Sequence, residues 1–269
     1  MDYFRYFIYG LIQGITEFIP ISSTGHLKII SLLFGLSDPG ASISAILQLG
    51  SVFAIIWFFR NDFKISNIFN QRFTYKSSYT IFILKSLSIG TLSILVFGFL
   101  IKVFLPNFTN SFLRSNLSIA FASILVALLM LFADRPRRAI FTLKRHSLFS
   151  SFFIGLGQAL AIIPGVSRSG ITISTSLLLG WKKQDAAKFS FLLGVPSISI
   201  AALVEILNLD SYQVLIKLGP LILGLITTFI ISIMSIKFFI RYISLNGLKI
   251  FAYYRLIFGT LIILSYFKF

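Results

Sequence analysis

The chain has 269 residues, of which 57% are hydrophobic and only 12% charged, about half the charged share of an ordinary soluble domain. This composition excludes a soluble globular protein and indicates a protein embedded in a membrane. The formal net charge of +16 arises from basic residues in short loops between apolar segments, so we attribute it to membrane topology and lipid contact and expect no nucleic-acid partner. The absence of cysteine excludes disulfides and thiolate chemistry.

The apolar stretches along the chain are of two kinds. Two of them, 6–20 and 148–163, run into a proline and a Ser/Thr/Gly cluster, and each is followed by a second short apolar stretch, 27–36 or 171–180. Pro and Gly end helices, so each unit predicts a helix, a break and a second helix, which we interpret as a re-entrant hairpin. Six further stretches are long enough to cross the hydrocarbon core: 43–59, 81–101, 117–133, 189–209, 218–240 and 250–267.

Basic residues in the loops predict the orientation. The loops 60–80, 134–146, 181–188 and 237–249 carry 4, 5, 3 and 3 Lys or Arg, whereas 36–42, 102–116 and 205–217 carry 0, 2 and 1. The first group should face the cytoplasm, which leaves both termini outside. Trp57 and Trp181 each precede a basic loop and are expected to be interfacial anchors, His146 to be solvated, and Lys85 and Arg255 to snorkel toward an interface.

A weak internal repeat relates the two predicted hairpins. At an offset of 145, five residues of the first unit match the second: Gly10, Leu11, Gln13, Ser22 and Gly25 match Gly155, Leu156, Gln158, Ser167 and Gly170. Three spans follow each hairpin, and because three is odd the second copy should be inverted. We therefore predict an all-α polytopic membrane protein forming one membrane domain, with repeat one at 1–134 and an inverted repeat two at 146–269. Such inverted repeats place a binding site where the hairpin tips meet, near the membrane midplane.

The first break carries the candidate chemistry of repeat one. Only Glu17 and Glu205 among the acidic residues fall inside apolar segments, and a carboxylate at membrane depth marks a functional site by default. We expect Glu205 to be solvated at the end of its span. Glu17 follows Gln13 by four residues on one helix face and precedes a polar cluster made of Ser22, Ser23, Thr24 and His26. The alternative is a purely structural pairing of Glu17 with Arg168.

The second break predicts an anion site. Arg168 is the only arginine inside a break, and a guanidinium can bind a phosphate with two parallel hydrogen bonds. Three nearby hydroxyls and two glycines that admit backbone amides complete the expected site: Ser167, Ser169, Thr172, Gly165 and Gly170. The helix that follows points its positive end at the same place. Snorkelling of Arg168 is the alternative. Gln48 either lines the cavity or bonds a neighbouring helix.

Both motifs resemble those of a known family. Residues 13–27, QGITEFIPISSTGHL, and residues 164–172, PGVSRSGIT, are similar to the two signatures of the bacterial undecaprenyl-diphosphate phosphatases, the bacitracin-resistance family, and the resemblance covers nearly the whole chain. It implies hydrolysis of undecaprenyl diphosphate to the monophosphate carrier lipid of cell-wall synthesis. It also implies a multi-pass protein of the bacterial cytoplasmic (inner) membrane, with an active site accessible from the outer face.

The resemblance suggests roles for the site residues. Arg168, with Ser167 and nearby amides, is expected to hold the diphosphate, while Glu17 acts as a base or as a ligand to Mg²⁺ or Ca²⁺ shared with the substrate phosphates. The family carries Glu or Gln at position 13, and here Gln13 leaves a single carboxylate. The nucleophile remains open between Ser23, His26 and an activated water. A flippase or transporter of polyprenyl phosphate or another anion, without hydrolysis, is the alternative function.

Overall fold

The computed structural model describes residues 2–61, 75–104, 112–136, 138–207 and 218–267, and within these ranges the regular elements are helices. Two isolated β-bridges, Phe141 with Trp181 and Thr142 with Arg145, are the remaining regular pairings of this part of the chain. The prediction of an all-α membrane protein is confirmed in this coarse form, since five helices are long and apolar enough to cross a membrane.

Both predicted units of helix, break and helix are present. The first consists of α1 (Asp2–Thr16) and α2 (Ser23–Leu33). The second consists of α7 (Leu148–Ala159), the short 3-10 helix η3 (Leu160–Ile162) and α8 (Arg168–Leu178). In each break one serine has a left-handed backbone, with φ of 77° at Ser22 and 68° at Ser167.

All six predicted spans are helical, and all but the last, 250–267, are among the five described helices that are long and apolar enough to cross a membrane. The six helices are α3 (Gly40–Phe59), α5 (Tyr75–Phe104), α6 (Asn116–Ala133), α9 (Lys183–Leu207), α11 (Leu218–Asn246) and α12 (Lys249–Phe267). Helices α9 and α11 extend beyond the predicted bounds into charged sequence, because a helix does not end where its apolar stretch ends. Parts of three loops used to predict the orientation, 62–74, 105–111 and 208–217, lie outside the described residues.

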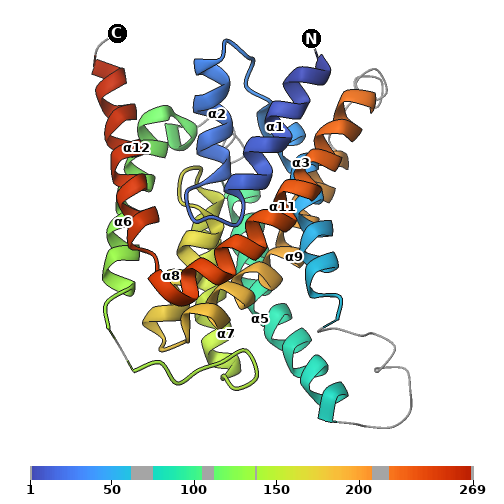
Figure 1. Ribbon diagram of the computed structural model, residues 1–269, viewed down its shortest axis with the longest axis vertical. Coiled ribbons are helices and arrows are strands. Elements are labelled where there is room, and N and C mark those ends of the chain that lie inside the picture. The colour runs from blue at the N-terminus through green and yellow to red at the C-terminus, as the bar shows by residue number, and fades with distance from the viewer. Residues whose placement is uncertain (1, 62–74, 105–111, 137, 208–217, 268–269) are drawn as a thin grey trace.

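The first helix of each hairpin packs on a span from the other half of the chain. Helix α1 lies against α11, and α7 lies against α5 (Figure 1). Glycines allow both contacts: a Cβ at Gly10 would lie 2.6 Å from the Gly224 carbonyl oxygen, and a Cβ at Gly155 would collide with the Gly90 carbonyl oxygen. Helix α6 packs on α12, and α3 packs on both α9 and α11. This interlocking brings the two breaks together in the middle of the molecule.

Two expectations about the basic loops are wrong. Trp181 is 1% exposed, and its indole N–H donates to Ser150 Oγ at 2.6 Å, so it is a core residue and no interfacial anchor. His146 packs on it, with ring centroids 4.6 Å apart, and its Nε2 lies 3.0 Å from Ser86 Oγ. Burial lowers the pKa of His146 below its ordinary value. An aromatic ring beside a basic loop is thus compatible with either a lipid interface or a loop folded onto the core. Trp57 is 52% exposed, and its place at an interface stays a prediction.

Candidate active site

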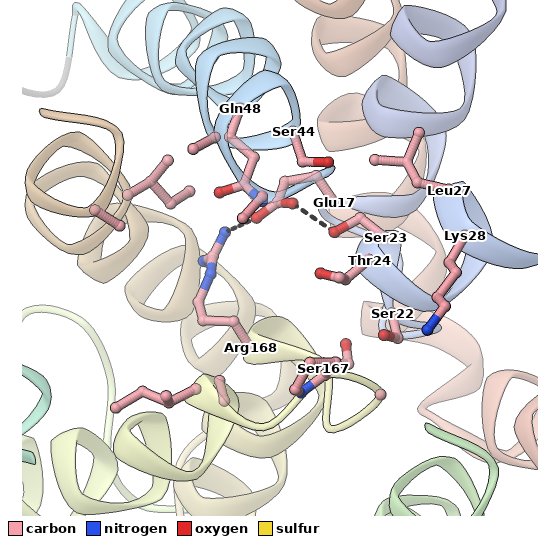
Figure 2. A pocket seen from close by; sticks show the side chains of 18 of the residues that line it. Glu17, Ser22, Ser23, Thr24, Leu27, Lys28, Ser44, Gln48, Ser167 and Arg168 are labelled. Carbon is pink, nitrogen blue, oxygen red and sulfur yellow. Dashed lines mark hydrogen bonds and ion pairs between the residues drawn. The ribbon is translucent and has the colours of Figure 1, made fainter. Parts of the chain in front are cut away.

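The two breaks enclose a cavity of about 410 Å³ together with the start of α3 and the end of α9. Eight of the predicted site residues line it: Glu17, Ser22, Ser23, Thr24, Gln48, Gly165, Ser167 and Arg168. Figure 2 shows Glu17 and Arg168 pointing toward each other from opposite hairpins, with Ser23, Thr24, Ser44 and Gln48 facing the same space. Residues of the two breaks therefore line one and the same cavity.

Glu17 is the centre of the hydrogen-bond network. Its Oε1 accepts from Arg168 Nη2 at 2.8 Å, and its Oε2 accepts from Gln13 Nε2 at 2.7 Å and from Ser23 Oγ at 2.9 Å. The residue is 6% exposed, so these donors replace the water that a carboxylate would otherwise require. A serine hydroxyl that donates to a buried carboxylate is placed as a nucleophile is beside its general base. A water bound at the same place would stand in the same relation to Glu17.

The guanidinium of Arg168 donates hydrogen bonds to both halves of the molecule. While Nη2 reaches Glu17, Nη1 donates to the Ser190 carbonyl oxygen on α9 at 2.8 Å. Its Nε is buried and has no hydrogen-bond partner in the part of the chain that the structure describes. The alternative of a snorkelling arginine is wrong, because the side chain is 11% exposed and lies in the cavity wall. The ion pair between Glu17 and Arg168 that the alternative requires is present, and it does not exclude a catalytic role for Glu17.

The second break presents one hydroxyl and buries the others. Ser167 lines the cavity and caps α8, its Oγ accepting from the Gly170 amide at 3.2 Å. Thr172 lies one turn into α8, where its hydroxyl donates to the Arg168 carbonyl at 2.8 Å and lies 2.6 Å from Ser190 Oγ. Ser169, Gly170 and Thr172 are buried behind the wall, so they support the break and do not line the cavity.

His26 is buried and is not among the residues that line the cavity. Its Nδ1 is 2.8 Å from the Ser22 carbonyl oxygen, which can only accept, so Nδ1 carries the proton. In the neutral ring Nε2 then accepts from the Tyr254 hydroxyl at 2.7 Å. The ring also stacks on Phe258, with centroids 4.3 Å apart. Contact with the phosphorus, as predicted for His26, would require this ring to leave its partners.

Gln13 and Gln48 occupy different places. Gln48 lines the cavity, as predicted in one of its two interpretations. Gln13 is fully buried behind Glu17, and its Oε1 has no hydrogen-bond partner. Among the described residues, no group of three or more His, Asp, Glu or Cys side chains could hold a metal ion. A cation would therefore depend on Glu17, with the Gln13 oxygen as a neutral ligand and phosphate oxygens completing the shell.

Several lining residues were not predicted from sequence. Lys28 and Asp38 line the cavity, as does Glu205, which we expected to be solvated and whose Oε2 accepts from Ser42 Oγ at 2.7 Å. Ser44 could have been found, because it stands four residues before Gln48 and so shares its helix face. Arg255, expected to snorkel, is fully buried, which is the largest error of the sequence prediction.

Comparison with known proteins gives a consistent result. The family model described as bacitracin resistance protein BacA matches residues 6–261. The chain is 56% identical over 268 residues to an undecaprenyl-diphosphatase of Prochlorococcus marinus subsp. pastoris, covering 98% of this chain and 100% of the relative. It is 42% identical over 266 residues to an undecaprenyl-diphosphatase of Trichodesmium erythraeum, covering 97% and 85%. The two break motifs, the cavity between them and this match over nearly the full length place the chain in the BacA bacitracin resistance family.

Proposed function

We propose that this protein hydrolyses undecaprenyl diphosphate to undecaprenyl phosphate and inorganic phosphate, which recycles the carrier lipid of cell-wall synthesis and confers bacitracin resistance. The relatives that match over their full length bear the name undecaprenyl-diphosphatase. The observation that carries the proposal is the Glu17, Ser23 and Arg168 constellation in a cavity between two helix breaks. It combines a base, a hydroxyl and a phosphate-binding fork within one network.

The reaction transfers the terminal phosphoryl group to Ser23 or to a water. The nucleophile's proton passes to Glu17 Oε2, and the bond from the terminal phosphorus to the bridging oxygen breaks, leaving the monophosphate lipid. The hydrogen bond of 2.9 Å from Ser23 to Glu17 supports Ser23, or a water in its place, over His26. If Ser23 attacks, a water then hydrolyses the phosphoserine: Glu17 returns its proton to Ser23 Oγ as the bond from phosphorus to Oγ breaks, and the water's protons leave with the inorganic phosphate. For His26 we propose a supporting role, since both its ring nitrogens are bonded away from the cavity.

The second break binds the diphosphate. Arg168 supplies the charged donors, Ser167 a hydroxyl, and the start of α8 the positive end of a helix dipole. Ser169, Gly170 and Thr172 keep this break in shape. A bound Mg²⁺ or Ca²⁺ would neutralise phosphate charge, and Glu17 together with the unpartnered Gln13 oxygen would hold it.

We also propose that the two hairpins are re-entrant and that the halves of the chain, 1–134 and 146–269, form an inverted repeat in the bacterial inner membrane. The matching left-handed serines, Ser22 and Ser167, support this, as does the reciprocal packing of α1 on α11 and of α7 on α5. The start of α1 and the end of α12 lie at one end of the molecule in Figure 1, and the basic segment 138–146 lies at the other. The cavity is lined by the start of α3 and the end of α9, which lie toward the end with the start of α1, so we propose access from the outer face.

Purified protein given undecaprenyl diphosphate tests this function. We expect phosphate release by the wild type and none above background for Ser23→Ala combined with Glu17→Gln. A flippase or transporter would move the lipid across a vesicle membrane without releasing phosphate. Transport by the wild type with no phosphate release would therefore refute the hydrolase and favour that alternative.

A further inference from the structure

Arg255 lies on α12 outside the cavity and is one of the largest fully buried side chains of the molecule. Its guanidinium donates to carbonyl oxygens of both breaks. Nη1 reaches Pro20 in the first break at 3.3 Å, and Nη2 reaches Gly165 at 2.7 Å and Val166 at 3.2 Å in the second. Two further acceptors on α6 are the carbonyls of Ala122 and Ser123. A single side chain thus links the first hairpin, the second hairpin and a span.

Among the residues that the structure describes, these carbonyl dipoles alone balance the charge of Arg255. Within the described ranges no carboxylate forms an ion pair with it. Burying an unpaired cation at membrane depth is costly, so such residues are rare and mark function. Helix breaks leave carbonyl groups without helical partners, and a guanidinium with five donors can satisfy several of them at once, whereas an ammonium has three donors at one point.

Helix α12 also holds the first break through the neighbours of Arg255. Tyr254 donates to His26, and Phe258, one turn further on, stacks on the same ring. Arg255 therefore acts as part of a rigid wall behind the first break. The Glu17–Arg168 contact in the cavity depends on the distance between the two breaks. Arg255, outside the cavity, bridges the same two breaks.

We propose that Arg255 is a positioning residue for phosphoryl transfer. It ties the Pro20 carbonyl of the first break to the Gly165 and Val166 carbonyls of the second, and so sets the distance between the base and nucleophile on one hairpin and the phosphate-binding arginine on the other. This inference rests on the proposed hydrolase function. A displacement of about 1 Å in a reacting constellation can reduce the rate about 100-fold, so loss of the tie should appear in turnover.

The test compares Arg255→Lys and Arg255→Met with Arg241→Lys, a matched control at an exposed position on α11. We expect Arg255→Lys to lower kcat at least ~10-fold with KM within about threefold of wild type, because Arg168 still binds the diphosphate. Arg255→Met should lower kcat further, and Arg241→Lys should match the wild type. An Arg255→Lys variant with wild-type kcat overturns the proposal.

A second measurement does not depend on activity. Leu33 of α2 and Leu160 of η3 are both exposed. Spin labels on cysteines introduced at these two positions report the distance between the hairpins by double electron–electron resonance. We expect a narrow distance distribution in the wild type and a broader one in Arg255→Lys. An unchanged distribution in the folded variant refutes the tie, and an Arg255→Lys protein that does not fold refutes it too, since Arg255 would then be required for folding alone. If the wild type releases no phosphate, the hydrolase function fails while the distance measurement still reports on the tie.

Discussion

Replacing Glu17 by Gln separates the charge of the carboxylate from its hydrogen bonds. The amide oxygen introduced at this position can still accept from Arg168, while the new NH₂ group faces Ser23 and Gln13. Gln13 can accommodate this by turning its own amide, because its Oε1 is buried without a partner and would then accept. The shape of the site is therefore retained, and the variant loses only the negative charge and the ability to take a proton.

Two effects of opposite sign should follow. Loss of the general base lowers kcat by ~10²–10⁴-fold, equivalent to about 2.7–5.4 kcal/mol of transition-state stabilisation. Arg168 keeps a hydrogen bond to the amide oxygen but loses the charged partner that it has at 2.8 Å in the wild type, so its positive charge is available to the diphosphate and KM should stay the same or fall. Removing one partner of a buried pair costs about 3–5 kcal/mol of stability. We therefore expect Tm to fall in the empty protein and to recover when an unreactive diphosphate analogue neutralises Arg168.

Steady-state phosphate release and thermal unfolding with and without the analogue measure these effects. Glu205→Gln is the matched control, because Glu205 is the other glutamate of the cavity and its Oε2 accepts only from Ser42 among the described contacts. We expect a change of about threefold or less for that variant. A Glu17→Gln variant that keeps more than a tenth of the wild-type kcat would refute a base at position 17. Recovery of kcat at high Mg²⁺ or Ca²⁺ would instead indicate that Glu17 acts as a cation ligand.

Three further predictions concern the guanidinium of Arg168, the contact between His26 and Tyr254, and the membrane topology. Arg168→Lys should lower kcat/KM at least ~10-fold, because one ammonium cannot serve both Glu17 and an incoming phosphate, and a charge-assisted hydrogen bond is worth about 1.5–3 kcal/mol; near-normal kinetics would exclude the fork. His26→Ala should lower kcat strongly while an analogue still binds, whereas Tyr254→Phe, which removes only the hydroxyl partner, should have a smaller effect; equal losses would contradict this order. On intact cells, an impermeant thiol reagent should label a cysteine at Phe112 and spare one at Lys144, and the reverse pattern would invert the topology.

Sequence reasoning succeeded where the signal is local. A proline followed by Ser, Thr and Gly ends a helix wherever it stands, so both breaks were predicted, and the matching offset of 145 indicated that they belong to one site. The contact between Glu17 and Arg168 was foreseen only as the structural alternative, although a carboxylate and a guanidinium at membrane depth need each other or a ligand. Helix ends were less well predicted because hydropathy marks the hydrocarbon core and not the last hydrogen bond.

The errors arose where a side chain forms hydrogen bonds with groups far away in the sequence. A lone arginine near the middle of an apolar stretch suggests snorkelling, since the sequence does not show which carbonyl oxygens it meets. The breaks themselves contained the missing signal: each leaves carbonyls without helical partners, and so a buried donor had to come from elsewhere. Arg255 supplies it. Trp181 was misjudged for a related reason, because its partner Ser150 stands far away in the sequence.

The left-handed serines predict how this protein should respond to laboratory evolution. At φ of 77° and 68°, Ser22 and Ser167 occupy conformations that disfavour any side chain by about 1–2 kcal/mol, and glycine would relieve that strain. Each hydroxyl nevertheless lies in the cavity wall and accepts from a backbone amide, of Gly25 at 3.4 Å and of Gly170 at 3.2 Å. A library selected for heat resistance should therefore accumulate glycine at these two codons, whereas the same library selected for survival in bacitracin should remove it.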